Sequence, residues 1–247
     1  MTDDDLDRAA DWLRLAERVC VLTGAGVSAE SGVPTFRASD GLWEGHRIED
    51  VASPEGFDRD PLLVWQFYNA RRANVKTVKP NSGHLALRDM EARWGERFTL
   101  VTQNVDGLHR TAGNKNVLEI HGSLYRTRCL GCEKVESRGL EPLGDAPECP
   151  HCLGQLRPDI VWFGEALPED IWYRAMAAAH ECDVLLVVGT SAVVHPAASL
   201  IPIAKRRHPR AKVVEVNLTP TEASALADVG LYAPSGVVLP KLVKKLG

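Results

Sequence analysis

Short apolar runs recur along this chain, and segments with the spacing of amphipathic helices separate them. We expect five of these runs to be strands: residues 19–23, 98–102, 117–120, 184–188 and 213–216. The run at 184–188 reads VLLVV, with no polar position on either face. Such runs are typical of strands that helices cover on both sides.

The segments between the runs predict helices. In the first, Thr2 can cap a helix whose buried face carries Leu6, Ala10 and Leu13. Asp60 and Pro61 have the side chains of a helix cap and first position, and the helix they open continues past Arg71. Further helices are expected at 81–95, 168–180, 196–207 and near the C-terminus. Strands that alternate with helices predict an α/β fold with a doubly wound, parallel, Rossmann-like sheet.

Two stretches interrupt this alternation, and we interpret the chain as a single domain, 1–247, with two insertions. Residues 34–80 read as a helical insert. Residues 123–158 are rich in Cys, Gly, Pro and charge and read as a smaller zinc-binding lobe. The large Rossmann-like lobe then consists of about 1–33, 81–122 and 159–247.

The composition and net charge of the chain argue against two classes of binding partner, nucleic acids and anionic membranes. The chain has 247 residues, 45% hydrophobic and 25% charged, with a formal net charge of -4. This balance gives no overall attraction to nucleic acid or to an anionic membrane, and we expect neither as a partner. The acidic start, MTDDDLDRAADW, lacks the features of a signal peptide. We therefore expect a cytoplasmic protein, and the oligomeric state stays open, a monomer included.

Four of the six cysteines form two pairs, Cys129-x-x-Cys132 and Cys149-x-x-Cys152. Two such knuckles, sixteen residues apart, can deliver four thiolates to one tetrahedral zinc ion. A site with four thiolates has no open position for a substrate, so the zinc should be structural. Cys20 and Cys182 lie in or beside apolar strands and read as small core residues.

The stretch VCVLTGAGVSAESGVPTFR, residues 19–37, joins the first expected strand to a glycine turn. Gly24 and Gly26 would let the backbone approach a pyrophosphate, although two glycines alone also fit an ordinary turn. Polar loops also follow two later strands, as Gln103-Asn104-Val105-Asp106 and His121-Gly122. Taken alone, these loops could simply be turns capped by their own side chains.

The glycine turn, both polar loops and the cysteine lobe resemble, in order and spacing, the sirtuins, which are NAD-dependent protein deacylases. The resemblance spans about 19–233 and implies NAD as co-substrate, acylated lysine on proteins as the partner and one structural Zn²⁺. It implies that Asn104, Asp106 and His121 are catalytic, with His121 as general base, a role that suits imidazole. It gives no such role to His84, His109 or His195.

The resemblance also implies binding residues. Those expected to bind NAD are Gly24, Ala25, Gly26, Ser28, Phe36, Arg37, Gln103, Asn104, Asp106, Gly189, Thr190, Ser191, Glu215, Val216, Asn217 and Ala233. The substrate peptide would lie extended along Val161, Trp162 and Phe163.

Tyr68 and Arg71 lie three apart in an expected helix and so share a face. Tyr-x-x-Arg at this place resembles the class III sirtuins, which remove succinyl and malonyl groups and often acetyl groups. A guanidinium and a phenol suit the distal carboxylate of such an acyl group. Ala52 matches the small residue that leaves room for the longer acyl chain.

Three other hypotheses stay open. The enzyme could be a deacetylase only, or a mono-ADP-ribosyltransferase that uses NAD without an acyl lysine. From a different class, the chain could be a non-catalytic NAD-binding module with a zinc ribbon. His121 and the complete loop from Gln103 to Asp106 argue against this last hypothesis.

Overall fold

A computed structural model describes residues 2–35, 42–43, 45–206 and 209–247. At its centre is a six-stranded sheet whose pairings are all parallel. In spatial order the strands are β11 (Val229–Tyr232), β10 (Lys212–Asn217), β9 (Val184–Val188), β1 (Val19–Thr23), β4 (Phe98–Thr102) and β5 (Val117–Glu119). β1 lies between β9 and β4, so the loops that follow these three strands emerge at one edge of the sheet.

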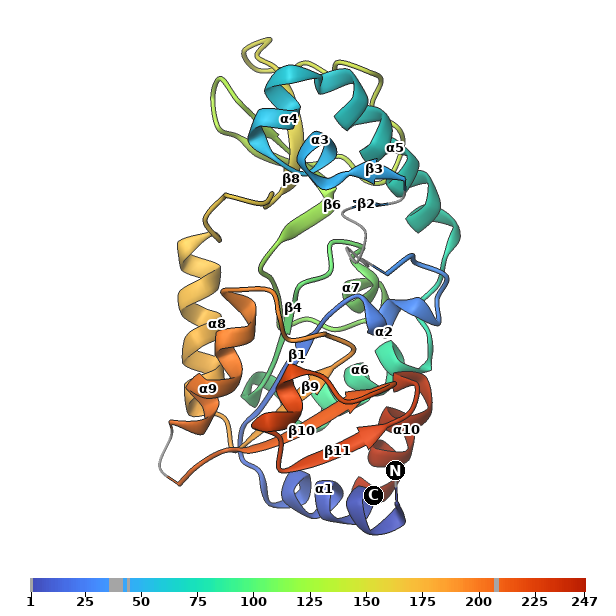
Figure 1. The fold of residues 1–247 in the computed structure, drawn as a ribbon, viewed down its shortest axis with the longest axis vertical. Helices are drawn as coiled ribbons and strands as arrows, with labels where there is room; N and C mark the ends of the chain where they lie inside the picture. Colours follow the sequence, from blue (N-terminus) through green and yellow to red (C-terminus); the bar gives the residue numbers. More distant parts are fainter. Residues whose placement is uncertain (1, 36–41, 44, 207–208) are drawn as a thin grey trace.

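Helices cover both faces of this sheet (Figure 1). One face packs against α1 (Asp3–Leu15), α6 (Ser82–Trp94) and α10 (Ser235–Leu246). The other packs against α8 (Glu169–Glu181) and α9 (Leu200–Lys205). Within β9, Leu186 points to the first core and Leu185 to the second, which is why this strand is apolar on both faces. The predicted doubly wound α/β fold is confirmed.

Among the described residues between β1 and α6, five elements form a layer beyond the edge of the sheet, in the upper part of Figure 1. Its elements are β2 (Leu42–Trp43), β3 (His46–Arg47), α3 (Ile48–Val51), α4 (Pro54–Arg59) and α5 (Pro61–Thr77). The Ser53 hydroxyl caps α4 by accepting from Gly56 N at 2.9 Å, and the Asp60 carboxylate caps α5 by accepting from Leu63 N at 2.9 Å. Pro54 and Pro61 occupy first helical turns, where no amide hydrogen is needed.

The cysteine-containing segment forms a separate antiparallel sheet with the order β7-β6-β8. Its strands are β6 (Gly122–Cys129), β7 (Val135–Ser137) and β8 (Leu156–Ile160). α5 packs on this sheet, and their apolar side chains form one continuous core. The buried guanidinium of Arg72 on α5 strengthens this contact by donating to the carbonyls of Leu124 and Glu141. The lobe boundaries expected from the sequence stay a prediction.

The other short helical elements include α2 (Gly26–Ala29), α7 (Leu108–Ala112), and the 3₁₀ turns η2 (Gly95–Arg97) and η4 (Glu222–Ala225). The helix expected at 196–207 is shorter than predicted, because a 3₁₀ turn, η3 (Ala197–Ser199), precedes α9. The sequence analysis also missed β11 and α7. Within the described residues, no helix has both the length and the apolar composition that crossing a membrane requires.

Candidate active site

The glycine turn after β1 presses its backbone against the turn after β9. Gly26 N donates to Gly189 O at 2.8 Å, and a Cβ on Gly26 would come within 2.7 Å of that same oxygen. Gly189 has φ +59, and a Cβ there would come within 2.4 Å of Val27 N. Both positions therefore require glycine. This contact brings Gly24, Ala25 and Gly26 beside Gly189 and Thr190, as expected for one binding edge.

A buried network of hydrogen bonds joins the glycine turn to the first polar loop. At its centre, Ser28 Oγ donates to Asp106 Oδ2 at 2.8 Å and accepts from Asn104 Nδ2 at 3.1 Å. Leu108 N holds the other carboxylate oxygen of Asp106 at 2.8 Å. Burial raises the pKa of Asp106, and the bonds from Leu108 and Ser28 oppose this rise. The structure thus brings together Ser28, Asn104 and Asp106.

His84 completes this network, although the sequence analysis gave it no role. Its Nδ1 accepts from Asn81 N at 3.3 Å, which leaves the proton on Nε2, 3.3 Å from Ser28 Oγ. The neutral ring therefore donates to Ser28. Burial lowers the pKa of His84 to about 4. The available signal was the spacing of Asn81 and His84, which form the two partners of a capping box at the start of α6.

His109 lies beneath the same loop and packs against His84, with ring centroids 4.8 Å apart. Thr23 Oγ1 donates to Thr102 Oγ1 at 2.8 Å, so His109 Nε2, at 3.0 Å, must donate to Thr23. Burial lowers the pKa of His109 well below its ordinary value, and the neighbouring His84 lowers it further. His109 is thus a neutral residue that supports the strand ends.

His121 lies in the turn after β5, and its ring contacts the loop that follows β4. Its Nδ1 lies 3.1 Å from Gln103 O, so Nδ1 carries the proton and Nε2 is left as an acceptor. Burial lowers the pKa of His121, and the bond to the Gln103 carbonyl opposes this effect. A neutral imidazole with an available Nε2 is what a general base requires.

Thr190 connects three of the loops expected to bind the dinucleotide. Its hydroxyl accepts from Gln103 Nε2 at 2.9 Å, and its carbonyl accepts from Asn217 Nδ2 at 2.9 Å. Ser191 follows on the exposed side, and Val216 lies buried in β10. The structure thus gathers Gln103, Thr190 and Asn217.

Glu215 is fully buried, and its carboxylate accepts hydrogen bonds from three hydroxyl groups. The donors are Thr221, Ser224 at 2.5 Å and Tyr232 at 3.0 Å. These contacts hold the loop after β10 against β11, which leads into Ala233. Glu215 therefore stabilises the loop that follows β10 through buried hydrogen bonds. The sequence analysis missed its hydroxyl partners because they come from three separate positions.

Tyr68 is fully buried in the core that α5 shares with the cysteine lobe. Its hydroxyl accepts from Trp162 Nε1 at 2.9 Å. Burial raises the pKa of Tyr68 to about 12, and the charge of Arg71 acts against this rise. Arg71 also acts on Asp106 in this way, so its charge lies within reach of both groups. The Arg71 guanidinium lies 5.6 Å from the Phe67 ring centroid.

A second set of contacts fixes the ring of Trp162. The Arg157 guanidinium lies 3.5 Å from the centre of the Trp162 ring, and Glu165 accepts from both terminal nitrogens of Arg157, at 2.6 and 2.9 Å. The indole, and through it the Tyr68 hydroxyl, is therefore held in one orientation.

The segment expected to bind the peptide runs beside Ala52 and His121. Val161 N donates to His121 O and Phe163 N to Ala52 O, both at 3.0 Å, while Trp162 N donates to Glu165 at 2.8 Å. These three amides are engaged within the chain, so main-chain bonds to a peptide would have to use carbonyl groups here. Ala52 is buried, and Phe163 is about half exposed.

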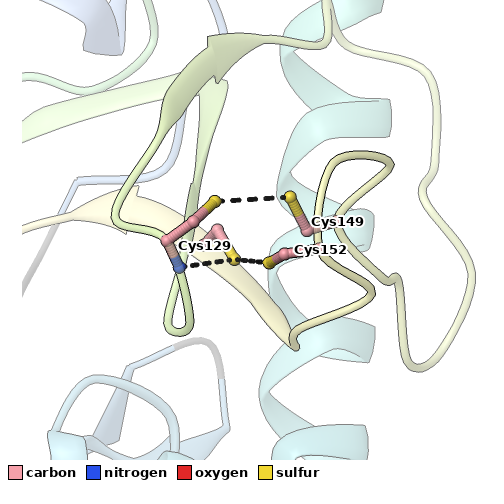
Figure 2. Close-up of side chains that lie close together, drawn as sticks. Cys129, Cys149 and Cys152 are labelled. Carbon is pink, nitrogen blue, oxygen red and sulfur yellow. Dashed lines mark hydrogen bonds between the residues drawn. The ribbon is translucent and has the colours of Figure 1, made fainter.

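The four cysteine thiols converge from two loops (Figure 2). Their sulfur atoms all lie within 4.8 Å of one another, with Cys129 to Cys152 at 3.4 Å and Cys132 to Cys149 at 3.8 Å. Sulfurs around a tetrahedral zinc ion are separated by about 3.8 Å. The amides of Cys132 and Gly131 lower the pKa of Cys129 to about 6, which favours the thiolate.

Gly154 leaves space for this cluster. A Cβ on Gly154 would lie 3.2 Å from the sulfurs of both Cys129 and Cys152. The donors, their spacing and this space fit one structural zinc ion with four thiolate ligands. His151 points elsewhere and contacts Glu136 at 2.6 Å.

Phe36 and Arg37, which were also expected to bind NAD, lie outside the described residues.

The Sir2 family profile matches residues 24–196 of this chain. The NAD-dependent protein deacylase 2 of Pyrobaculum aerophilum is 48% identical over 96% of this chain and 94% of its own length. The NAD-dependent protein deacylase of Pyrococcus furiosus is 48% identical over 98% of both chains.

Solved structures agree with these relatives. A Sir2 homologue in complex with NAD has a TM-score of 0.90 and 41% identity, covering 97% of this chain and 93% of its own. Sir2Af2 bound to a myristoylated histone peptide has a TM-score of 0.79 and 34% identity, covering 99% of this chain and 97% of its own. The family profile and the identity to these relatives over nearly the whole chain show that the chain belongs to the Sir2 family, the NAD-dependent protein deacylases known as sirtuins.

Proposed function

We propose that this NAD-dependent protein deacylase removes succinyl and malonyl groups from lysine side chains, and acetyl groups as well. The observation that carries the proposal is the environment of the Tyr68 hydroxyl. That oxygen accepts from the Trp162 indole, and within the described part of the chain no acceptor takes its own proton, so this proton can be donated to a ligand. The ring is buried, so a group that meets this proton does so away from water.

Arg71 lies one helical turn after Tyr68 on α5 and so faces the same side. The carboxylate at the end of a succinyl or malonyl chain could accept from its guanidinium and from the Tyr68 hydroxyl together. A buried carboxylate needs such partners, since an isolated charge away from water is strongly disfavoured. An acetyl group has no charge and requires neither contact.

The reaction begins when the carbonyl oxygen of the acyl-lysine bonds to C1′ of the nicotinamide ribose. The bond from C1′ to nicotinamide breaks, and its electron pair leaves with the nicotinamide nitrogen. In this step, Asn104 and Asp106 orient the ribose, and the bonds from Ser28 and Leu108 hold them in place. The glycine turn lets the backbone approach the pyrophosphate.

His121 acts in the following step. Its available Nε2 takes the proton from a ribose hydroxyl, and the oxygen of that hydroxyl then attacks the carbon that came from the acyl carbonyl. The bond from this carbon to the lysine nitrogen then breaks, and the lysine amine leaves with a proton. One water molecule adds to the carbon, and the bond from the carbon to the C1′ oxygen breaks. The products are free lysine, nicotinamide and 2′-O-acyl-ADP-ribose. We assign the remaining NAD contacts to Gly189, Thr190, Ser191, Asn217 and the loop at Ala233.

Acyl-lysine peptides carrying acetyl, succinyl or malonyl groups in one sequence would test this function. We expect Arg71→Met to lower kcat/KM for the succinyl peptide by the equivalent of roughly 2–5 kcal/mol, because the acyl carboxylate loses its charged partner. The acetyl peptide should react nearly as before. Tyr68→Phe should act in the same direction by about 0.5–1.5 kcal/mol, since one neutral donor is lost.

Lys76→Met is the matched control, because Lys76 is an exposed cation on the same helix and pairs with Glu141. It should leave the ratio of succinyl to acetyl turnover unchanged. An equal loss for both peptides in Arg71→Met would exclude the acidic-acyl preference. Turnover of the acetyl peptide alone by the wild type would identify a deacetylase, and labelled ADP-ribose on protein without acyl removal would identify a transferase.

A further inference from the structure

Two carboxylates that take no part in the proposed chemistry are buried on either side of His121. Glu119, the last residue of β5, is 4% exposed, and Asp159, within β8, is 7% exposed. They belong to different sheets, the large parallel sheet and the small antiparallel one. A buried carboxylate destabilises a fold unless a cation or several donors accompany it.

One guanidinium joins the two carboxylates. Arg126, on β6, donates through Nε to Asp159 at 2.8 Å and through Nη1 to Glu119 at 3.0 Å. We call these three residues the Arg126 bridge. Two further arginines, both exposed, each form an ion pair with one of these carboxylates: Arg110 with Glu119 and Arg128 with Asp159. Arg126 alone among the described residues contacts both carboxylates.

The turn that carries His121 lies between the ends of this bridge. Glu119 precedes His121 by two residues, and the carbonyl of His121 accepts from Val161 N, two residues after Asp159. Gly122 has φ +85, and a Cβ there would come within 2.0 Å of Asp159 O. The backbone on both sides of His121 is therefore in contact with the strands that Arg126 connects.

We propose that Arg126 is a positioning residue, which holds His121 in place by fixing β5 and β8 to β6 through Glu119 and Asp159. This proposal rests on the proposed function, in which His121 is the general base. Without the Arg126 guanidinium, each buried carboxylate keeps only one exposed arginine, Arg110 or Arg128, and the ionic link between β5 and β8 is lost. The strands can then separate or admit water. The His121 turn would shift with them, and a displacement of about 1 Å can lower a rate about 100-fold.

The two steps of the reaction allow this role to be separated from general damage to the fold. Nicotinamide leaves before His121 accepts a proton, so exchange of labelled nicotinamide into NAD needs a bound acyl peptide but no base. Acyl removal needs both. A variant that displaces only the base should therefore lose acyl removal and retain exchange.

The test compares Arg126→Gln and Arg126→Lys with wild type in both assays, using one acetyl-lysine peptide. In Arg126→Gln, we expect kcat for acyl removal to fall about 10- to 100-fold, while nicotinamide exchange and KM for NAD change less than about twofold. Arg126→Lys keeps the charge but loses the fork that reaches both carboxylates, so it should recover part of the rate. Arg128→Gln, which alters an exposed contact to Asp159 alone, should stay near wild type.

Equal losses in exchange and acyl removal would overturn the proposal and leave Arg126 with a purely structural role. Unchanged acyl removal in a folded Arg126→Gln would also overturn it. Should Arg126→Gln fail to fold, Asp159→Asn gives the same comparison, because it keeps the side-chain shape and weakens one end of the bridge. Absence of both activities in the wild type would instead reject the proposed function.

Discussion

A single nitrogen, Nε2 of His121, distinguishes the two steps of the proposed reaction. We expect His121→Ala to fold normally and to lose about 10²- to 10⁴-fold in acyl removal, which is the range that one positioned base contributes. Nicotinamide exchange should persist, because no base acts before nicotinamide leaves. His180→Ala, which changes an exposed histidine on α8, is the matched control. Acyl removal at the wild-type rate in His121→Ala would exclude the role.

For individual residues, the sequence predicted those whose function can be inferred from the spacing of a motif. The two Cys-x-x-Cys pairs indicated a zinc site before any geometry was known, and the four sulfurs do converge. Contacts between distant positions were not predictable. The bond from Trp162 to Tyr68 joins residues 94 positions apart, and neither residue type signals the other. The same holds for the hydroxyl groups around Glu215.

Among the helices, α6 begins with a titratable group in its capping box. His84 accepts from Asn81 N and is held neutral by burial, which lowers its pKa from 6.5 to about 4. In the unfolded chain, His84 binds a proton below about pH 6.5, so acid favours unfolding. The stabilisation is complete above that pH and is lost as the pH falls toward 4.

We therefore expect the free energy of unfolding to fall by about 2 kcal/mol on account of His84 when the pH drops from about 7.5 to about 5. Denaturant unfolding of wild type and His84→Gln at both values measures this contribution. The variant should be less stable than wild type at the higher pH, and its stability should depend less on pH. An identical pH dependence in the two proteins would contradict the prediction.

Elements with strong patterns were predicted well, and elements with mixed patterns were not. The apolar runs located β1, β4, β9 and most of β10. β11 was missed because Gly230 interrupts a short run, and a Cβ there would meet the Tyr232 ring at 2.4 Å. The helix expected at 196–207 begins late, since Pro202 has no amide hydrogen and fits only in the first turn of α9.

Across the whole molecule, the cysteine lobe and α5 share one core, so the zinc site and the surroundings of Tyr68 depend on each other. Replacing Cys149 and Cys152 by serine should remove the zinc and release this core, because zinc binding supplies folding free energy directly. We expect the succinyl peptide to lose turnover. Binding of ADP-ribose, which we expect to rest mainly on the parallel sheet, should decrease much less.

Tryptophan fluorescence can follow this release. Trp65 and Trp162 are buried in the shared core, and Trp65 Nε1 donates to Leu156 O at 3.1 Å. Their emission should move to longer wavelength in the variant as water reaches them. A variant without zinc that keeps both its emission and its succinyl turnover would show that the lobe folds independently of the metal.

For the whole molecule, the sequence predicted the fold class but not how the insert and the cysteine lobe pack together. Alternating strands and helices indicated a doubly wound sheet, the cysteine pairs indicated a zinc lobe, and the break in the alternation at 34–80 indicated a helical insert. No local pattern revealed that the insert and the lobe would pack into one core, because Val64 and Leu156 look like ordinary apolar residues in separate segments. Such packing depends on the tertiary path of the chain.

The bond from Phe163 N to Ala52 O has a consequence for how such enzymes diversify. It joins the insert to the peptide segment through main-chain atoms, so any residue at position 52 can retain it. Under the proposed function, the side chains at 52, 68 and 71 can therefore change to suit a new acyl group while this main-chain bond persists. The residues expected to bind NAD need not change with them.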